Sequence, residues 1–350
     1  MSPLLHDAGM DFVVPAEAEA RAPAERRGLS RDGVRMLVAR GTDVGHQVVT
    51  DLPGVLAPGD LVVVNTSATL PAALDAARGD GRIQPLHVAS ELDDGRWVVE
   101  LRRVDNTGPD PGVRPGTRLS LPGGVRLTIA AAYPDPTAAT SRLWTARPAP
   151  VTRSATQLAQ HGRPIRYGYV AEPWPLADYQ TVFATYPGSA EMPSAGRPFT
   201  DRLVVRLVAA GVAVVPVTLH CGVSSPEAHE SPAPERFDVP DATARLVNAV
   251  RESGGRIVAI GTTVVRALES VTDASGAARS GAGWTDLALG PDRPARVVTG
   301  LLTGLHEPGA SHLELLEAVA GTEAVRAAYS AAVDEGYLWH EFGDTTLFLP

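Results

Sequence analysis

The chain has 350 residues, 44% of them hydrophobic, and a formal net charge of −9. This length suits two domains with a substantial core, and the apolar fraction excludes a disordered protein. There is no apolar run of about 18 residues and no signal peptide, so we expect a cytoplasmic protein with no membrane partner. The single cysteine, Cys221, excludes an intramolecular disulfide and a cysteine-based zinc cluster.

The first half of the chain predicts a buried strand followed by a β-rich region. Leu61–Val64 is an apolar run after a Pro-Gly-Asp turn, which is typical of a buried strand. Between residues 72 and 150 helical periodicity is absent, and short strand-like segments alternate with Gly, Pro and Asp turns: Gly81–Val88, Arg96–Arg103, Thr117–Leu121, Val125–Ala131 and Ser141–Ala146. This spacing predicts a small antiparallel β-barrel.

After Val151 helical and strand patterns alternate. The pattern predicts elements over Phe199–Ala210 (helix), Val212–Leu219 (strand), Asp241–Ser253 (helix), Ile257–Ile260 (strand) and Thr262–Ser270 (helix). Such units indicate a mostly parallel sheet flanked by helices. We therefore predict an α/β fold in which residues 1–71 and 151–350 form a discontinuous α/β domain and residues 72–150 form an inserted barrel domain.

The segment Tyr179–Thr200 is long, irregular and rich in glycine and proline. Gly188 and Gly196 allow a ligand to approach the backbone closely. The prolines exclude a helix interior and a central strand; they are Pro187, Pro193 and Pro198. By composition alone the segment is either a binding loop or a structural Ω-loop.

A Gly-Thr-Thr turn, Gly261–Thr263, joins a predicted strand to a predicted helix. Free backbone N–H groups and the helix dipole suit this position to a carboxylate, although Thr262 could equally be a plain helix cap. Arg266 lies one turn further on the same face, where it could hold a carboxylate or pair with Glu269.

Three further polar residues follow predicted strands or turns. His220 ends the strand Val212–Leu219, and active-site residues gather at the carboxyl ends of strands in open α/β sheets. His306 lies in a loop, and Asp344 precedes the last strand. Each of the three is also compatible with a purely structural role. No metal site is evident in the sequence, and we expect none.

Six segments resemble, in order, the S-adenosylmethionine:tRNA ribosyltransferase-isomerase family of queuosine biosynthesis. The most regular is GGRIVAIGTTVVRALES at Gly254–Ser270, and the loop Tyr179–Thr200 carries YQTVFA, GS, PSAG and FT. The others begin at Asp11 (with RAPAERR), Leu56 (APGDLVVVNTSA), Val217 (TLHCG) and Val298 (TGLLTGLHEP, later GYLWHEFGDTTLFL). The resemblance spans nearly the whole chain and implies the same barrel-in-α/β fold.

The resemblance also implies a reaction and its substrates. S-adenosylmethionine donates its ribosyl part to 7-aminomethyl-7-deazaguanine in tRNA, the sugar rearranges to give epoxyqueuosine, and adenine and methionine leave. The co-substrate is S-adenosylmethionine, no metal is needed, and the protein is expected to be a monomer or a weak homo-oligomer. By position in the motifs, catalytic roles fall to His220, His306 and Asp344.

Substrate and S-adenosylmethionine contacts are implied for the remaining motif positions. These are Tyr179, Gln180, Phe183, Gly188, Ser189, Met192, Pro193, Ser194, Ala195, Gly196, Phe199, Thr200, Gly222, Gly261, Thr262, Thr263, Arg266 and Glu269.

The chain departs from the family pattern at cationic positions. Ala68, Pro198 and Gly309 stand where the family carries arginine, histidine and lysine. Two alternatives therefore stay open: the same ribosyl transfer to a small-molecule acceptor, or a non-catalytic adenosyl-binding paralogue. The charge of −9 is also unfavourable for RNA, which needs local positive charge. Arginines do group mildly, at Arg21, Arg26, Arg27, Arg31 and Arg35 and again at Arg163 and Arg166.

Overall fold

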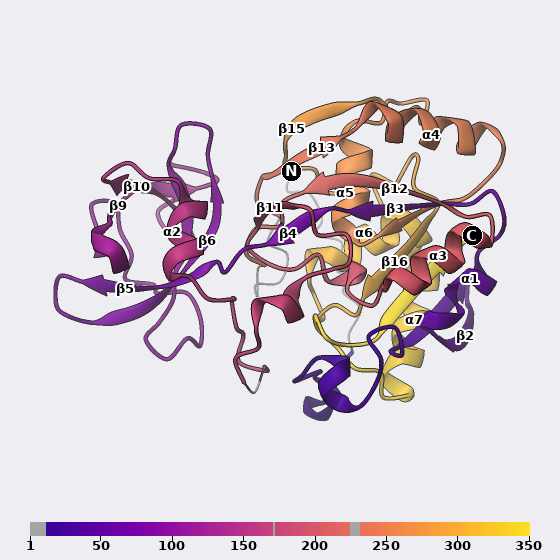
Figure 1. The fold of residues 1–350 in the computed structure, drawn as a ribbon, viewed down its shortest axis with the longest axis horizontal. Coiled ribbons are helices and arrows are strands. Elements are labelled where there is room, and N and C mark those ends of the chain that lie inside the picture. The colour runs from indigo at the N-terminus through magenta and orange to yellow at the C-terminus, as the bar shows by residue number, and fades with distance from the viewer. Residues whose placement is uncertain (1–11, 171, 225–231) are drawn as a thin grey trace, which may run out of the picture.

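The computed structural model describes residues 12–170, 172–224 and 232–350. Two parts lie side by side in Figure 1, a small β-barrel on the left and a larger helix-flanked sheet on the right. The predicted α/β fold with an antiparallel barrel is thus confirmed. The bounds of the two domains stay a prediction, and Asp11 lies outside the described residues.

A nine-stranded mixed sheet forms the larger part. Its centre consists of four parallel strands: β12 (Ala213–Leu219), β3 (Leu61–Asn65), β14 (Ile257–Ile260) and β16 (Gly300–Gly304). Antiparallel β13 (Glu235–Val239) and β15 (Gly281–Thr285) extend one side. On the other side β17 (Thr345–Leu349) runs antiparallel to β16, followed by β1 (Arg35–Arg40) and β2 (Asp43–Val48). The sheet is therefore parallel at its centre and mixed at its margins.

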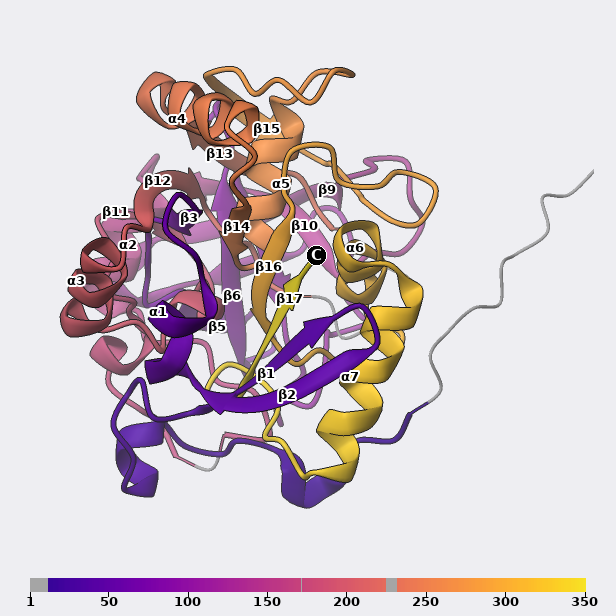
Figure 2. The same ribbon diagram turned by 90° about the vertical axis from the view of Figure 1, so that its right-hand side faces the viewer.

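Helices cover both faces of this sheet because its central strands are apolar on both faces. Every residue of β3 is buried. Leu61 and Val63 pack with α4 (Asp241–Glu252), α5 (Thr262–Ser270), α6 (Ser311–Ala320) and α7 (Thr322–Asp334). Val62 and Val64 pack with α1 (Leu52–Val55) and α3 (Asp201–Ala209) on the opposite face (Figure 2).

The barrel closes through six antiparallel strands in the order β10-β7-β6-β5-β8-β9. Their bounds are β5 Ala73–Arg78, β6 Ile83–Glu91, β7 Trp97–Leu101, β8 Arg118–Ser120, β9 Arg126–Tyr133 and β10 Leu143–Ala149. Buried Trp97 and Trp144 fill its interior together with aliphatic side chains. Helix α2 (Ser154–His161) packs on the barrel, where the Gln157 amide donates to the Pro122 carbonyl at 2.6 Å.

The chain enters and leaves the barrel through two segments that pair with each other. The Ala73 and Arg163 backbones exchange two hydrogen bonds, each 2.9 Å long. Gly162 lies at this crossing, where an added Cβ would come within 2.0 Å of the Pro71 carbonyl oxygen. Only glycine fits so close a backbone contact.

The remaining elements are short. A two-stranded parallel ribbon, β4 (Ser67–Thr69) with β11 (Tyr186–Ser189), links the sheet to the loop Tyr179–Thr200. The 3₁₀ turns are Ala16–Ala18, Ala24–Arg27, Val49–Asp51, Pro122–Gly124, Leu176–Tyr179 and Ser194–Gly196. Among the residues that the structure describes, no helix combines the length and apolar character needed for a membrane span.

The buried carboxylate of Asp60 holds the start of β3 against the start of β14. It accepts the Ala57 N–H at 2.7 Å and the Arg256 N–H at 3.1 Å, and it pairs with the Arg256 guanidinium. Asp60→Asn should lower the free energy of unfolding by about 1.5–3 kcal/mol, because hydrogen bonds to a charged group are lost. Urea unfolding measures this, with the exposed pair variant Asp80→Asn as the control. Equal effects of the two variants would contradict the assignment.

Candidate active site at the sheet edge

Four of the site residues predicted from the sequence lie at one edge of the sheet. Strands β3, β12, β14 and β16 are parallel, so their carboxyl ends share this edge, which faces the barrel in Figure 1. Strand β17 begins there, because Thr345 pairs with Gly304 at the end of β16. The edge therefore carries His220, Gly261, His306 and Asp344. In open α/β sheets, ligands bind at the carboxyl ends of the strands.

Asn65, the last residue of β3, ties three parts of this edge together. Its side-chain nitrogen donates to the Leu219 carbonyl at 2.8 Å and to the Thr263 hydroxyl at 3.2 Å. Its side-chain oxygen accepts the N–H groups of Leu219 and Ser67, both at 3.0 Å. Asn65 thus fixes the end of β12 and the start of α5 relative to β4.

The loop Tyr179–Thr200 meets His220 through two serines. The Nδ1 atom of His220 lies 2.7 Å from the Ser67 hydroxyl, which lies 2.6 Å from the Ser189 hydroxyl. Burial lowers the pKa of His220, so the ring is neutral near pH 7. Gly188 packs flat on this ring, because an added Cβ would come within 2.3 Å of Nδ1. The structure therefore brings Gly188, Ser189 and His220 together.

The same loop meets the Gly-Thr-Thr turn. Gly261 has a φ of 97°, and a Cβ there would lie 3.2 Å from the Ala195 methyl carbon. Helix α5 begins at Thr262, and its N-cap is Gly261 with no side-chain hydrogen bond. The expectation that Thr262 caps the helix is wrong, because glycine supplies the left-handed geometry at that position.

Arg266 is buried and bonds to Glu235 rather than to Glu269. Its guanidinium pairs with the Glu235 carboxylate and donates to the carbonyls of Leu287 at 3.0 Å and Thr285 at 3.1 Å. The other carboxylate oxygen of Glu235 accepts the Gly222 N–H at 2.7 Å. Burial raises the pKa of Glu235, and the charge of Arg266 opposes that rise.

Glu269 binds the backbone of the loop before β16. It accepts the backbone N–H groups of Arg296, Val297 and Val298 at 2.9–3.1 Å. The alternative in which Glu269 pairs with Arg266 is therefore wrong. A contact between Glu269 and substrate stays a prediction.

His306 lies against a second histidine. Its Nε2 atom is 3.0 Å from the Thr303 hydroxyl, and its ring stacks on His312 with centroids 4.5 Å apart. Burial lowers the pKa of His306 well below its ordinary value and that of His312 to about 4. Both rings are therefore neutral near pH 7, and a proton-transfer role for His306 stays a prediction.

The contacts that the Asp344 carboxylate makes in the structure are structural. It accepts the N–H groups of Arg35 at 2.9 Å and Leu338 at 2.8 Å, and it pairs with the Arg35 guanidinium at 3.2 Å. Only 4% of the residue is exposed. These contacts hold the start of β17 against β1, and a catalytic role for Asp344 stays a prediction.

Several loop residues implied as binding residues have structural contacts. Gln180 makes two hydrogen bonds with the Thr69 backbone, at 3.0 and 2.8 Å. Phe199 is fully buried against Phe183, with ring centroids 5.4 Å apart. The Thr200 hydroxyl caps α3 by accepting the Leu203 N–H at 3.1 Å. Their contact with a ligand stays a prediction.

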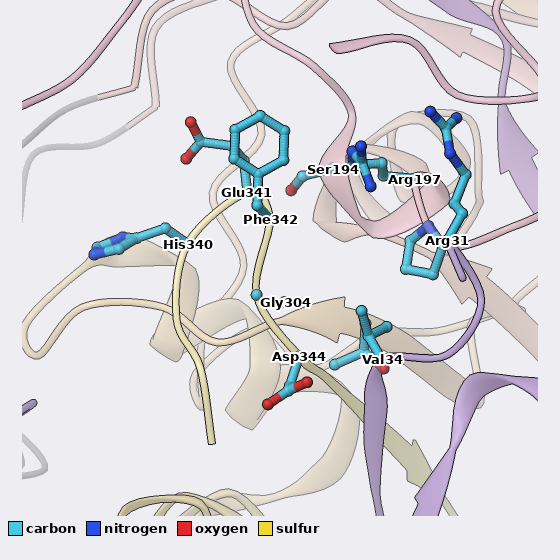
Figure 3. Close-up of a pocket in the computed structure, with 12 residues that line it drawn as sticks. Arg31, Val34, Ser194, Arg197, Gly304, His340, Glu341, Phe342 and Asp344 are labelled. Atoms are coloured by element: carbon cyan, nitrogen blue, oxygen red, sulfur yellow. The ribbon is translucent and has the colours of Figure 1, made fainter. Parts of the chain in front are cut away.

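A pocket opens beside the loop and the start of β17 (Figure 3). Its lining includes Ser194, Arg197, His340, Glu341 and Phe342. Tyr179 and Met192 pack in a cluster with Phe342. His340 and Glu341 were not singled out from the sequence, although both lie inside the segment GYLWHEFGD that carries the resemblance. Across the described part of the chain, no group of three or more His, Cys, Asp or Glu side chains could hold a metal ion.

Comparison with known proteins identifies the family. Residues 8–348 match the family model described as queuosine biosynthesis protein. The chain belongs to this family. It is 35% identical to the S-adenosylmethionine:tRNA ribosyltransferase-isomerase of Acidiphilium cryptum, over 97% of this chain and 98% of that protein. It is 36% identical to the enzyme of the same name from Rubrobacter xylanophilus, over 97% and 96%.

A solved member of the family has a similar fold. The crystal structure of an S-adenosylmethionine tRNA ribosyltransferase from Thermotoga maritima matches with a TM-score of 0.53 and 27% identity, and the match covers 97% of this chain and 99% of that one. The family relationship therefore extends over both the barrel and the sheet.

Gly188 offers a test of the contact between loop and histidine. Gly188→Ala should lower the free energy of unfolding by about 1–3 kcal/mol, because the added methyl group overlaps the His220 ring. Denaturant unfolding measures this change. Gly79→Ala is the matched control, since a Cβ there meets nothing within 4 Å. An unchanged Gly188→Ala midpoint would show that loop and ring are not packed as described.

The stacked histidines make stability depend on pH. The folded state keeps His312 neutral down to about pH 4, whereas the unfolded imidazole takes a proton near its ordinary pKa of about 6.5. The unfolded state thus binds more protons between these values, so the free energy of unfolding falls as the pH drops from about 6.5 to 4. His312→Gln should reduce this fall by at least about 1 kcal/mol.

Urea unfolding at a series of pH values measures that slope. His161→Gln, at the exposed end of α2, is the control and should keep the wild-type slope. A slope that is the same in all three proteins would refute the role of the stacked pair.

Proposed function

We propose that this chain transfers and isomerises the ribosyl moiety of S-adenosylmethionine onto 7-aminomethyl-7-deazaguanine in tRNA, giving epoxyqueuosine with release of adenine and methionine. The observation that carries the proposal is the family match over residues 8–348. The meeting of the family's loop, its Gly-Thr-Thr turn and His220 at one sheet edge supports it. The reaction would take place in the cytoplasm, where the protein acts as a monomer or a weak homo-oligomer.

The chemistry requires proton transfer without a redox step. A base must take a proton from the carbon beside the sulfonium, and an acid must protonate the departing adenine. A neutral histidine is suited to the first task near pH 7. Ser67 engages Nδ1 of His220, which leaves Nε2 as the nitrogen that can meet a substrate. Because the sulfonium itself acidifies the adjacent carbon, the proposal invokes no metal.

The donor is proposed to lie between the loop and the start of α5. A helix N-terminus attracts a carboxylate, here that of the methionine part. Gly261 and Ala195 approach closely at this point, so the loop can cover the adenosyl part. Arg266 is already paired with Glu235, which in turn accepts the Gly222 N–H. We therefore propose that Arg266 positions Glu235 and Gly222 beside the donor and does not itself bind the methionine carboxylate.

A small-molecule acceptor is the second candidate, and the arginines near the N-terminus favour it. Arg27 donates to the Phe342 carbonyl, Arg31 to Glu25 and the Gln180 carbonyl, and Arg35 pairs with Asp344. These cations are engaged within the protein, so fewer remain for tRNA phosphates. The departures at Ala68, Pro198 and Gly309 point the same way.

Adenine release separates the two acceptors. The protein is incubated with S-adenosylmethionine and either tRNA bearing the deazaguanine base or the same tRNA bearing guanine. We expect adenine and methionine only with the deazaguanine tRNA. Binding of that tRNA should weaken steeply, by about 10³-fold if six phosphates are contacted, between 50 and 200 mM salt, because counterions are released. Adenine release with the free base 7-aminomethyl-7-deazaguanine in place of tRNA, together with salt-independent tRNA binding, would favour the small-molecule acceptor.

A further inference from the structure

Two tyrosine–glutamate pairs lie side by side where the barrel meets the sheet edge. The Tyr169 hydroxyl donates to Glu341, and the Tyr167 hydroxyl donates to Glu191. The two tyrosine rings stack with centroids 6.0 Å apart. The tyrosines follow the barrel in the chain, whereas Glu191 belongs to the Tyr179–Thr200 loop and Glu341 to the segment before β17. Three distant parts of the chain thus converge on two carboxylates.

Within the described part of the chain, these carboxylates form no ion pair. Neither Glu191 nor Glu341 forms an ion pair with any arginine or histidine among the described residues. Besides Tyr167, the donors to Glu191 among the described residues are the N–H and hydroxyl of Ser224, at 2.8 and 2.5 Å. Burial raises the pKa of Glu341 to about 7 despite its hydrogen bond from Tyr169. The charge of Glu191 adds to the rise, and the charge of Arg197 opposes it. Removal of a charge from water is costly unless an opposite charge balances it.

Two arginines of the region form ion pairs with other carboxylates. Arg197 pairs with Glu25 and lies over the Phe342 ring, and Arg102 pairs with Glu100. Figure 3 shows Glu341 and His340 on one side of the pocket view, and Arg31 and Arg197 on the other. Arg266 neutralises Glu235, the third carboxylate of this region.

The histidines of the region add no positive charge near pH 7. Burial lowers the pKa of His220, His306 and His340, and Glu307 and Glu19 partly oppose the shift at His340. His340 itself stacks on Tyr169 with centroids 3.9 Å apart. Once ionised, Glu191 and Glu341 therefore carry two negative charges that no ion pair among the described residues balances.

An unpartnered hydroxyl points to a ligand at the same place. Tyr179 is only 5% exposed, and its hydroxyl has no hydrogen-bond partner among the described residues. Burial raises the pKa of Tyr179. The charge of Glu341 adds to this rise, and the charges of Arg166 and Arg197 oppose it. The Tyr179 ring packs on Phe342 at 5.2 Å. Carboxylates, a free hydroxyl and aromatic rings together are the groups that bind an organic cation.

We propose that Glu191 and Glu341, with Tyr167, Tyr169 and Tyr179, form a subsite that binds an organic monocation. The inference rests on the proposed function for the identity of the cation, which is either the ammonium of the aminomethyl base or the sulfonium of the donor. Both present a single positive charge on a small alkyl group.

Matched pairs of cationic and neutral probes test this subsite by calorimetry at pH 8, where Glu341 is ionised. The first pair is 7-aminomethyl-7-deazaguanine and its neutral 7-cyano analogue. The second pair is S-adenosylmethionine and S-adenosylhomocysteine, which has a neutral thioether. Glu341→Gln and Glu191→Gln should each reduce the preference for the cationic member of one pair at least 10-fold. Glu323→Gln, on the exposed surface of α7, should leave both preferences unchanged.

The responding pair identifies the cation, and either response supports the subsite. Glu341→Asp, which keeps the charge, should retain most of the preference, and it shows whether an effect of Glu341→Gln is electrostatic rather than a folding defect. Unchanged preferences in both glutamine variants would overturn the proposal. Adenine release by the wild type with deazaguanine tRNA reports separately on the proposed function. Adenine release together with unchanged probe preferences in the variants would contradict only the subsite. A preference for the cationic probes without adenine release would contradict only the proposed reaction.

Discussion

The buried amide of Asn65 is the constraint on which the geometry of the sheet edge depends. One side chain bonds to both backbone groups of Leu219, to the Thr263 hydroxyl and to the Ser67 N–H. Loss of the amide would leave these buried groups unpaired, which costs about 1–3 kcal/mol for each group. Because Ser67 in turn holds the His220 ring, the position of that histidine is set by a residue that needs no contact with any ligand.

Charge is distributed unevenly around this edge. The chain has 31 basic residues, all of them arginine, yet those nearest the edge tie segments of the protein together. Burial lowers the pKa of His220 and His306, while the carboxylates of Glu191 and Glu341 accept, among the described residues, from hydroxyl and N–H groups only. The proposed cation subsite depends on this local distribution, which the overall charge of −9 does not reveal.

The local sequence pattern was sufficient to predict the bounds of elements that are buried and flanked by glycine. Strand β14 and helix α5 have the bounds predicted from the sequence, because an apolar run lies between Gly255 and Gly261. Strand β2 was not predicted, since most of its residues are exposed and show no alternation. Helices α6 and α7 were also not predicted individually.

The candidate site also contains residues that the sequence predicts and residues that it does not. His220 and Gly261 follow from the rule that sites lie at strand ends. Glu341 does not follow from this rule, because its partner Tyr169 lies 172 positions away in the sequence. The two residues come together in the fold, where the segment before β17 returns to the sheet edge. The Arg266–Glu235 pair was missed for a similar reason, since a nearer acid, Glu269, stands on the same helix.

The paired entry and exit of the barrel have a mechanical consequence. The entering segment continues directly from β4, whose Ser67 holds the His220 ring, and the leaving segment is hydrogen-bonded to it through Arg163. A large acceptor that displaces the barrel would therefore pull on the strand that carries Ser67. Only five residues of chain, Ser67 to Pro71, separate the start of the barrel from the contact that orients the His220 ring.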